Sequence, residues 1–567
     1  MAKARDLRRE KFLREAVVEC PGRGLCHWID ALAEHVYQRL RERGKCSNVV
    51  FNGGLSVSGL QHIGRLRGEV IINDVVASIL EAKGCKVKRI LTLYTQDAWK
   101  GKREQLNQFA NVDEASKYKG WPLIRIPDPL GAVSNWVERY WSDFGPYLNM
   151  FTRGRVEVVT TSELYQGKLL EFTKRAIKVR EKVREIINKY RGRQPYPDTW
   201  IPFEPVCGSC GRIDTTMTLK VDLEKNKVQY MCRNCGHIGE TKLSNGKLNW
   251  RLEWVGVWWA LNVSFEPYGK DHAAPGGSRD SAAELAINVF GIEPPEGMPY
   301  EWVALKLSDG RQRDMSSSGF IGFTPRDWLE VATPELLRFL FLRTPPMKKI
   351  ALSLHEIPQY YNLYYKAERI YYGIEKAGDE HEKILLSRSY ELSYVQGSPP
   401  PTPPAQPPYT HLAILSQVLP REKWGDEGLR RLQQSGHLPE KPSMHDVKRI
   451  LGLMPKARVW AQKYAPEHMK VTILREVPEE LTKRIPEAYR ELIVQLGQKL
   501  GRLDQWSEDS IKKAMIEFTA SWENSKRKTF YKYIYMILVG RENGPRAAPL
   551  LSLLPRNFVI QRFLSLK

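Results

Sequence analysis

The chain has 567 residues, with 87 Lys or Arg against 65 Asp or Glu, and so a formal net charge of +22 at pH 7. A domain usually takes about 100–200 residues, so several domains are expected. The basic excess predicts a polyanionic partner such as a nucleic acid, with a merely solvated basic surface as the alternative. The sequence has no apolar run near the roughly 20 residues of a membrane span and no signal peptide at residues 1–15, so we expect a cytoplasmic protein without membrane contact.

The N-terminal segment, residues 1–47, is predicted to be a helical extension. Its first 15 residues are basic and helix-prone, and they could contact RNA or form a solvated helix face, of which we favour the second. The basic residues there are Lys3, Arg5, Arg8, Arg9, Lys11 and Arg14.

A strand followed by a glycine-bearing turn and a long helix is the most informative pattern in the chain. Residues 48–51 predict a short apolar strand that stops at Gly53 and Gly54, and apolar residues then recur at helical spacing from Ile63 to a helix end near Gly84. The turn between them would present backbone N–H groups and the positive end of a helix dipole to a phosphate. An ordinary strand–helix turn with a surface histidine is the alternative.

Two residues of this turn suit a nucleotide. Gly64 leaves room for a flat base to lie on the backbone, and His62 could hydrogen-bond a phosphate oxygen. The turn is therefore a candidate nucleotide site.

Strands and helices alternate over residues 48–135 and again over 250–345, with a further apolar strand at Val87 to Tyr94. Such alternation is typical of a parallel α/β sheet. Residues 136–249, which show helical periodicity from Lys168 to Tyr190, interrupt the pattern. We therefore expect one parallel-sheet domain split by an insertion.

Four of the eight cysteines form two Cys-x-x-Cys pairs separated by 21 residues. Each pair can place two thiolates on one tight turn, and two such turns complete the tetrahedral site that zinc prefers, with Gly208, Gly211 and Gly236 supplying backbone freedom. A structural zinc site is therefore predicted, with a degenerate site of reduced cysteines as the alternative. The predicted zinc ligands are Cys207, Cys210, Cys232 and Cys235. The other four lack such spacing and are expected to be ordinary thiols: Cys20, Cys26, Cys46 and Cys85.

The composition changes beyond residue 346. Residues 346–396 are rich in tyrosine and are expected to be helical, whereas residues 397–408 hold seven prolines and predict a semi-rigid linker or exposed loop. Residues 409–567 mix apolar positions with Lys and Arg at helical spacing, which predicts an all-α domain. Its aromatic residues could stack on bases, although such residues are more often core: Phe530, Tyr531, Tyr533 and Tyr535.

Two short motifs occur in a meaningful order. The run from Ser58 to Arg65 is similar to the HIGH signature of class I aminoacyl-tRNA synthetases, and Met315-Ser316-Ser317-Ser318 resembles their KMSKS loop at a suitable distance downstream. With the segments 250–254, 266–278, 299–302, 324–330 and 334–339, they resemble the class I lysyl-tRNA synthetase family, closely over residues 27 to 375.

The resemblance implies a class I synthetase fold. It implies a Rossmann-type parallel sheet in two halves, an insertion with a zinc-binding segment at 207–235, a stem-contact region at 346–396 and an all-α anticodon-binding domain at 409–567. It also implies an ATP-dependent, Mg²⁺-assisted ligase that activates lysine to lysyl-adenylate and transfers it to the 3′ end of tRNA(Lys). We expect a monomer.

The same resemblance assigns site residues. His62 would contact the phosphates, Gly64 would lie under adenine, and the loop from Met315 to Ser318 would close over pyrophosphate. The adenylate would be bordered by Ser58, Gly59, Asp271 and His272. The lysine pocket would contain Gly54, Ser56, Trp250 and His272. Our own candidate for binding the ε-ammonium is Glu253, because a buried cation needs a paired charge, and a surface carboxylate beside Arg251 is the alternative.

Four positions depart from the family pattern: Arg65 stands where the signature ends in histidine, Val57 where proline is common, and Asp314 and Gly319 where lysine is frequent. An aspartate would repel a triphosphate, and losing one transition-state cation could cost on the order of 10²–10³ in rate.

Arginines near the second motif could compensate. Arg311, Arg313 and Arg326 lie close in sequence, and arginine grips phosphate at two points, so Arg313 is a candidate adenylate ligand. A catalytically impaired tRNA-binding paralogue is one alternative function. Another is a class I synthetase for a different amino acid such as glutamate, although glutamate would demand an arginine-lined pocket.

Overall fold

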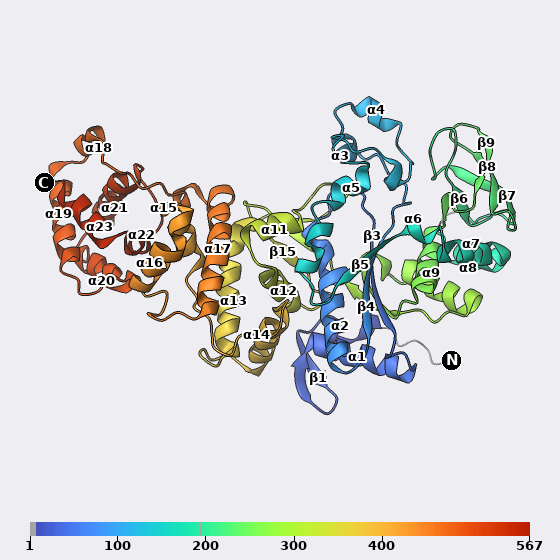
Figure 1. Ribbon diagram of the computed structural model, residues 1–567, viewed down its shortest axis with the longest axis horizontal. Helices are drawn as coiled ribbons and strands as arrows, with labels where there is room; N and C mark the ends of the chain where they lie inside the picture. The colour runs from blue at the N-terminus through green and yellow to red at the C-terminus, as the bar shows by residue number, and fades with distance from the viewer. Residues whose placement is uncertain (1–6, 193, 567) are drawn as a thin grey trace. The chain divides into compact units, whose positions relative to one another are not determined.

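The computed structural model describes residues 7–192 and 194–566, which divide into two compact units (Figure 1). The second unit comprises Trp328–Leu336, Ser353–Lys376 and the chain from Ser398 onward, and the first unit holds the rest. The region 346–396 is therefore shared between the two units and does not form a block of its own.

A five-stranded parallel sheet lies at the centre of the first unit, with strand order β12-β11-β3-β4-β5 (Figure 1). This confirms the predicted parallel sheet, and β11 and β12 come from beyond residue 250 as expected. Strand β5, however, lies within residues 136–249, so the sheet extends into the region predicted to be an insertion. The strands are β3 (Val49–Leu55), β4 (Val87–Leu93), β5 (Val156–Thr160), β11 (Phe265–Gly269) and β12 (Glu296–Tyr300).

Gly53 and Gly54 were predicted to end the first strand, but both lie inside β3. A Cβ atom on Gly53 would come within 2.7 Å of the Glu69 carbonyl oxygen. The glycine is therefore needed for the close approach of the following helix, and the strand continues through it.

The helix after β3 is built in three stages. A 3-10 turn at Ile63–Leu66 leads into a π-helical segment at Arg67–Ile72, and α2 follows at Asn73–Ala82. Gly84 has φ +91°, which confirms the predicted glycine-terminated helix end. Single π-helical turns often occur at functional sites, and this one directly follows the HIGH-like run.

Two apolar clusters fix the helices of the first unit. One joins α1 (Trp28–Glu42) and α2 to the sheet. The other joins four helices, two before and two after the cysteine segment 207–235. The helical stretch predicted from Lys168 to Tyr190 is broken at Val179 into two helices. These helices are α7 (Lys168–Lys178), α8 (Arg180–Lys189), α9 (Trp250–Leu261) and α10 (Ser278–Leu285).

The N-terminal extension is only partly helical. An antiparallel hairpin of β1 (Val17–Cys20) and β2 (Gly24–His27) precedes α1. Arg8 forms an ion pair with Asp280 at 2.9 Å, so this residue does not belong to a solvated face as predicted. Lys3 and Arg5 lie outside the described residues.

Two disulfides correct the prediction that four cysteines are ordinary thiols. Cys20 is bonded to Cys26 across the hairpin, and Cys46 is bonded to Cys85. The second pair is brought together because β3 and β4 run in parallel from Val49 opposite Val87, a pairing that sequence spacing alone does not display.

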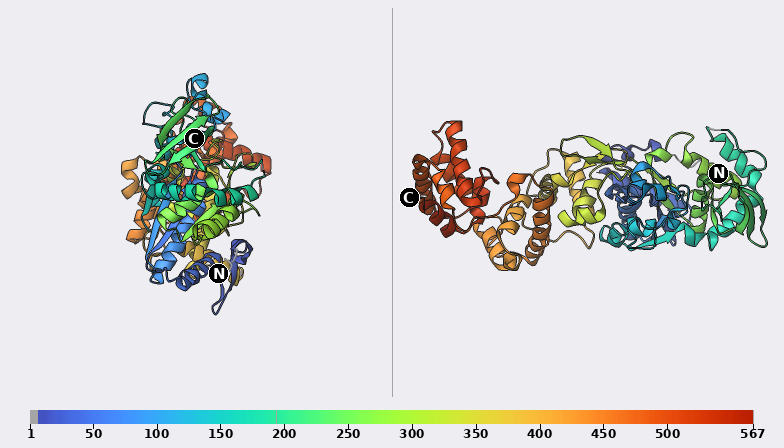
Figure 2. Two further views of the ribbon diagram at one scale, coloured as in Figure 1. Left: turned by 90° about the vertical axis from the view of Figure 1, so that its right-hand side faces the viewer. Right: turned by 90° about the horizontal axis from the view of Figure 1, so that it is seen from above.

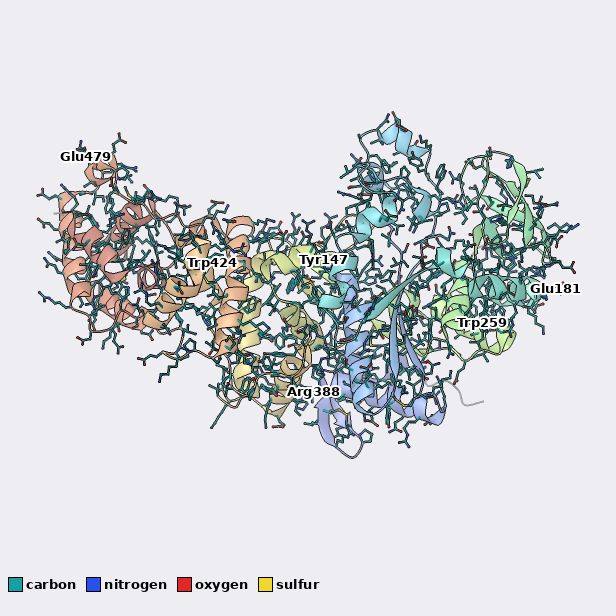
Figure 3. All side chains as sticks on the ribbon, viewed as in Figure 1. Tyr147, Glu181, Trp259, Arg388, Trp424 and Glu479 are labelled. Carbon is teal, nitrogen blue, oxygen red and sulfur yellow. A yellow bond between two sulfur atoms is a disulfide. The ribbon has the colours of Figure 1, made fainter. Side chains whose placement is uncertain are left out.

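Helix α14 (Glu380–Ser393) packs on the hairpin side of the first unit. Arg388, labelled in Figure 3, makes two hydrogen bonds of 2.8 and 2.9 Å to Asp30 of α1. Segments about 360 positions apart are thus held together by a bidentate pair.

The second unit is helical in its described part. Helices α19 to α23 pack against one another, and the right-hand view of Figure 2 shows the red helices grouped at the C-terminal end. Arg449 of α17 donates to both carboxylate oxygens of the buried Glu368 of α13, at 3.0 and 2.9 Å. The longer helices are α13 (Ile357–Tyr371), α15 (Tyr409–Val418), α17 (Met444–Lys463), α19 (Glu487–Gly501), α20 (Glu508–Phe518), α21 (Asn524–Val539), α22 (Ala547–Leu553) and α23 (Arg556–Leu564).

The proline-rich segment is packed within the second unit, which corrects the prediction of a linker or exposed loop. The Ala405 N–H donates to Asp446 at 2.5 Å, and the Gln406 amide donates to Glu368 at 2.6 Å. Pro399, Pro400, Pro404 and Pro407 are buried. Among the helices of the described residues, none is long and apolar enough to cross a bilayer.

Candidate functional site

A cavity of about 760 Å³ opens beyond the carboxyl ends of the parallel strands. Ligands of open parallel sheets bind at this edge. The cavity is lined by most of the residues that the sequence singled out: Gly54, Ser56, Ser58, His62, Gly64, Trp250, Asp271, His272, Met315, Ser316, Ser317 and Ser318.

The two motifs meet along one wall of this cavity. The Ile63 N–H donates to the Phe323 carbonyl at 2.8 Å, and Arg65 Nε donates to Ser317 Oγ at 2.8 Å. A Cβ atom on Gly59 would collide with the Ser317 carbonyl oxygen, so Gly59 supports this contact although it does not line the cavity.

His62 is poised for a ligand at this wall. Its Nδ1 is buried and has no hydrogen-bond partner among the described residues. Burial, assisted by Arg65, holds the pKa of His62 well below its usual range, so the ring is neutral at pH 7. A Cβ atom on Gly64 would lie 3.0 Å from His62 Nδ1, so this glycine keeps the histidine face clear.

Glu266 of β11 is the carboxylate at the other end of the cavity. It is 1% exposed and accepts hydrogen bonds from Asn52 Nδ2, Trp254 Nε1 and Trp258 Nε1 at 2.7, 2.9 and 2.5 Å. Over residues 7–192 and 194–566, no Lys or Arg forms an ion pair with it, and Arg279, which lies over the rings of Trp254 and Trp258, acts on it only at longer range. Burial raises its pKa, and a cationic ligand would restore the charged form.

Aromatic rings enclose this end of the cavity. Trp250 packs against Tyr94 and Trp254 with ring centroids 5.0 and 5.6 Å apart, and Trp254 lies 5.4 Å from the His272 ring. A Cβ atom on Gly54 would lie 3.0 Å from Tyr94 and 3.8 Å from Glu266 Oε1. Gly54 therefore sets the width of a narrow, apolar channel that ends at a carboxylate.

Glu253, predicted to bind an ammonium group, does not line the cavity. It is buried, it accepts a hydrogen bond from Tyr165 at 2.7 Å, and it forms an ion pair with Lys247 at 3.1 Å. Lys247 also pairs with Asp97 at 2.6 Å. The charge of Glu253 is thus balanced inside the protein. This corrects the prediction that Glu253 binds an ammonium group, and also the alternative that it is a surface carboxylate beside Arg251.

Arg313, predicted to bind the adenylate, is exposed and does not line the cavity either. In β14 (Gln312–Asp314) it alternates with Asp314, which does line the cavity, so the two side chains point to opposite faces. Arg311 and Arg326 pair with Asp309 and Asp143.

Other cations lie at the second motif. Lys349 pairs with Asp314 at 2.6 Å, so this aspartate does not present an unbalanced charge. Lys102 Nζ donates to Ser318 Oγ at 3.0 Å, and Arg65 holds Ser317. Sequence reasoning missed Lys102 and Lys349 because each lies far along the chain from the loop that it contacts.

The four predicted metal ligands converge in the insertion. The sulfurs of Cys207 and Cys235 are 3.7 Å apart and those of Cys210 and Cys232 are 3.6 Å apart. They lie beside a three-stranded antiparallel sheet of β7 (Thr216–Asp222), β8 (Lys227–Cys232) and β9 (Ile238–Lys242). Sulfurs about 2.3 Å from one tetrahedral zinc ion would have this spacing, so the group could hold a metal ion.

Two of the three glycines at these turns have the expected conformation. Gly211 and Gly236 have φ of +74° and +71°. Gly208 has no positive φ, and its N–H instead donates to the Tyr230 hydroxyl at 2.7 Å.

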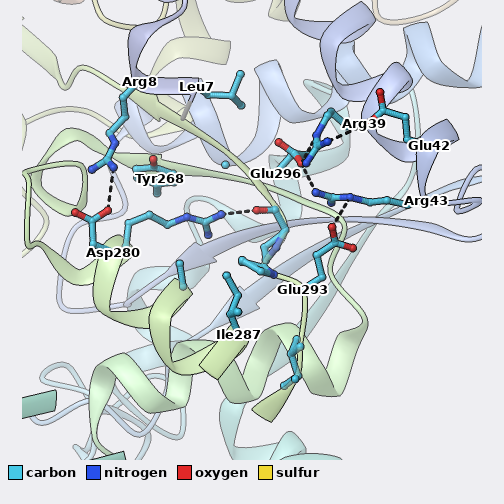
Figure 4. Close-up of a pocket in the computed structure, with 17 residues that line it drawn as sticks. Leu7, Arg8, Arg39, Glu42, Arg43, Tyr268, Asp280, Ile287, Glu293 and Glu296 are labelled. Carbon is cyan, nitrogen blue, oxygen red and sulfur yellow. Dashed lines mark hydrogen bonds and ion pairs between the residues drawn. The ribbon is translucent and has the colours of Figure 1, made fainter. Parts of the chain in front are cut away.

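A second cavity, of about 610 Å³, shares Tyr268 with the first (Figure 4). Several of its charged residues pair with one another, among them Arg43 with Glu296 and Arg8 with Asp280 at 2.9 Å. Arg279, which also lines this cavity, lies over the Trp258 ring and interacts electrostatically with Glu266. In the first cavity, by contrast, Glu266 forms no direct ion pair among the described residues, although Arg279 lies near enough to lower its pKa.

Sequence reasoning also missed Tyr94, Glu266 and Tyr300, which line the first cavity. A signal for Glu266 was present, since it lies in the segment 266–278 that carries the resemblance, three positions before the strand end at Gly269.

Comparison with known proteins agrees with this geometry. A family model described as tRNA synthetases class I (K) matches residues 26–396, and an anticodon binding domain model matches residues 461–565. The lysine–tRNA ligase of Aeropyrum pernix is 51% identical over 537 residues, covering 94% of this chain and 97% of that protein. The lysine–tRNA ligase of Methanocaldococcus jannaschii is 32% identical over 550 residues, covering 95% and 99%.

Among solved structures, a glutamate tRNA ligase from Elizabethkingia meningosepticum matches with a TM-score of 0.38 and 11% identity, covering 92% of this chain and 99% of that one. That likeness is too distant to support an argument about function. The family model alone spans well over half of the chain, and the archaeal relatives align along nearly its whole length. This chain belongs to the class I (K) tRNA synthetase family.

Proposed function

We propose that this protein is an ATP-dependent lysine–tRNA ligase, which forms lysyl-adenylate and transfers the lysyl group to tRNA(Lys). The observation that carries the proposal is the 51% identity, over 94% of the chain, to a lysine–tRNA ligase. A cavity that joins both motifs to a buried carboxylate without a cation supports it.

The reaction consists of two acyl-transfer steps. The lysine carboxylate attacks the α-phosphate of ATP, and the bond to pyrophosphate breaks. A ribose hydroxyl at the tRNA 3′ end then attacks the activated carbonyl, and AMP leaves. The protein must align these groups and stabilise the charge that develops on the phosphates.

The HIGH-like turn is proposed to hold the nucleotide. Neutral His62 would donate a hydrogen bond to a phosphate oxygen, and Gly64 would lie against the adenine. Ser58 and Gly59 would border the adenylate from the same turn, and Asp271 and His272 from the opposite strand end. His62 lines the cavity, and its buried Nδ1 has no hydrogen-bond partner among the described residues, which supports this arrangement.

Positive charge at the second motif would come from Arg65 and Lys102, because neither motif lysine of the usual loop is present. Both donate to the serines of the loop from Met315 to Ser318, so they are placed to follow it onto the pyrophosphate. Replacing Arg65 with Ala should slow ATP–pyrophosphate exchange about 10–100-fold, whereas Arg313→Ala should leave it unchanged. The opposite result would return the role to Arg313.

The lysine side chain is proposed to enter between Gly54, Ser56, Trp250 and His272 and to end at Glu266. Its methylene groups would lie against the aromatic rings, and its ammonium would pair with the carboxylate. Acidic residues outnumber basic ones on the cavity wall, which disfavours glutamate. The acidic ones are Glu69, Asp97, Glu266, Asp271 and Asp314, against Arg65 and Lys100.

Structural zinc is proposed for Cys207, Cys210, Cys232 and Cys235, where it would hold the two turns of the insertion together. Mg²⁺ would enter with ATP and screen its phosphates. The helical C-terminal part would bind the anticodon. A monomeric, cytoplasmic enzyme remains our expectation.

The deciding experiment is amino-acid-dependent ATP–pyrophosphate exchange with each of the twenty amino acids, with and without bulk tRNA. Exchange with lysine alone, followed by lysyl-tRNA formation, is expected. Exchange with glutamate or another amino acid would change the assignment. Tight tRNA binding without exchange would favour the impaired paralogue, against which the Lys349–Asp314 pair argues.

A further inference from the structure

A cluster of two histidines and one glutamate lies in the second unit, far along the chain from both motifs. His411 belongs to α15, His437 follows α16 (Leu429–Gln434), and Glu508 begins α20. His411 is 5% exposed, so the cluster is largely closed to solvent on one side. None of these residues takes part in the reaction proposed above.

The three side chains converge on one point. The Nε2 atoms of His411 and His437 lie 2.6 and 3.2 Å from the same oxygen, Oε2 of Glu508. The two rings are 4.3 Å apart, and the three ligand atoms all lie within 4.8 Å of one another. No described residue donates to the other carboxylate oxygen of Glu508, so both rings crowd a single atom.

The convergence of these three ligand atoms could also hold a metal ion. A zinc ion binds imidazole nitrogen and carboxylate oxygen at about 2.0–2.2 Å, so two ligands at tetrahedral angles lie about 3.3 Å apart. His437 already has this spacing to Glu508, and His411 would move slightly away from Glu508 to admit the ion. Without a metal ion, the same oxygen can accept a hydrogen bond from each ring, because a carboxylate oxygen has two lone pairs. Neutral imidazoles are the form that metals bind.

We propose that His411, His437 and Glu508 form a second zinc site, separate from the four cysteines and completed by solvent at the partly exposed edge of Glu508. Two histidines and one carboxylate leave a fourth, open position on zinc. The ion would tie α15, the segment after α16 and the first turn of α20 together, across 97 positions of sequence.

Zinc stoichiometry of the full-length protein tests this proposal. The protein is equilibrated with about 1 µM free Zn²⁺, washed in metal-free buffer and analysed by elemental mass spectrometry. Two zinc ions per chain are expected for the wild type and one for His437→Gln, which keeps a polar side chain of similar length. The matched control is His445→Gln, an exposed histidine of the same unit, and it should retain two.

Cys207→Ser combined with Cys210→Ser isolates the new site. This variant should retain one zinc ion, and X-ray absorption at the zinc edge should show only nitrogen and oxygen neighbours. Glu508→Gln gives a second test should His437→Gln fold poorly, and it should also lower the content to one. A wild type with a single zinc ion that the cysteine substitutions remove, or two ions unaffected by His437→Gln and Glu508→Gln, would overturn the proposal.

Discussion

Two buried carboxylates of the first unit differ in how their charge is balanced. Asp74 of α2 accepts hydrogen bonds from Arg89 at 2.9 Å and Arg338 at 2.8 Å, and from two backbone N–H groups. Glu266 in the cavity accepts only from neutral donors. The difference fits the proposal that the charge of Asp74 holds the fold, whereas that of Glu266 pairs with the lysine ammonium.

Asp74→Asn should have the largest effect, and on stability alone. It would leave the fully buried Arg338 without its counter-charge, which costs about 3–5 kcal/mol. Urea unfolding measures the loss, while exchange activity per folded molecule should be unchanged. Glu157→Gln is the control, because its ion pair with Lys88 is half exposed and should contribute under about 1 kcal/mol.

Glu266→Gln should reverse this pattern. We expect kcat/KM for lysine in the exchange reaction to fall roughly 10²-fold, about 3 kcal/mol, with the KM for ATP nearly unchanged. Glu253→Gln is the matched control, since it is equally buried but already paired with Lys247. A selective loss of lysine affinity in the Glu253 variant instead would show that the comparison assigns the substrate to the wrong carboxylate.

A disulfide also stabilises the first unit around the cavity. The Cys46–Cys85 disulfide closes a loop of 39 positions, and replacing both residues with serine should lower stability by about 2–4 kcal/mol. The Cys20–Cys26 pair closes 6 positions and should contribute less. Thermal unfolding of each double variant, with and without reductant, checks the order. Equal losses of stability in the two double variants would contradict the expected dependence on loop length.

The features predictable from sequence are those defined by local spacing. The HIGH-like and serine-rich motifs, the parallel sheet and the two Cys-x-x-Cys pairs each depend on neighbours within a few positions. The disulfide between Cys46 and Cys85 depends on the parallel pairing of β3 and β4, and the Lys349–Asp314 pair on the pairing of β13 (Val303–Lys306) with β14 and β15 (Ile350–Leu352). Such contacts arise only when the chain folds.

The error at Glu253 has a helical explanation. Trp250, Trp254 and Trp258 recur every four residues and so face the same side of α9, toward Glu266. Glu253 lies one position before Trp254, about 100° around the helix, and so faces Lys247. Sequence proximity to the tryptophans was therefore misleading.

Two histidines of the first unit show the same contrast as the two carboxylates, with a smaller expected effect. His27 of the frame is satisfied on both nitrogens, by the Ile29 N–H at 3.2 Å and Ser389 Oγ at 2.9 Å, whereas His62 of the cavity has a free Nδ1 among the described residues. Burial lowers the pKa of His27 to about 3. The unfolded chain therefore binds a proton that the folded protein refuses, and stability falls as pH drops below about 6.5.

Between pH 7 and pH 5 this linkage should remove about 2 kcal/mol from the first unit. His27→Gln keeps a donor and an acceptor but does not titrate, so the stability difference between wild type and variant should shrink by that amount over the same interval. Denaturation curves of the full-length wild type and variant at pH 7, 6 and 5 measure this stability difference, with the exposed His445→Gln as control. If the stability difference between wild type and His27→Gln did not change with pH, His27 would not be held neutral by the fold. The contrast drawn between His27 and His62 would then be wrong.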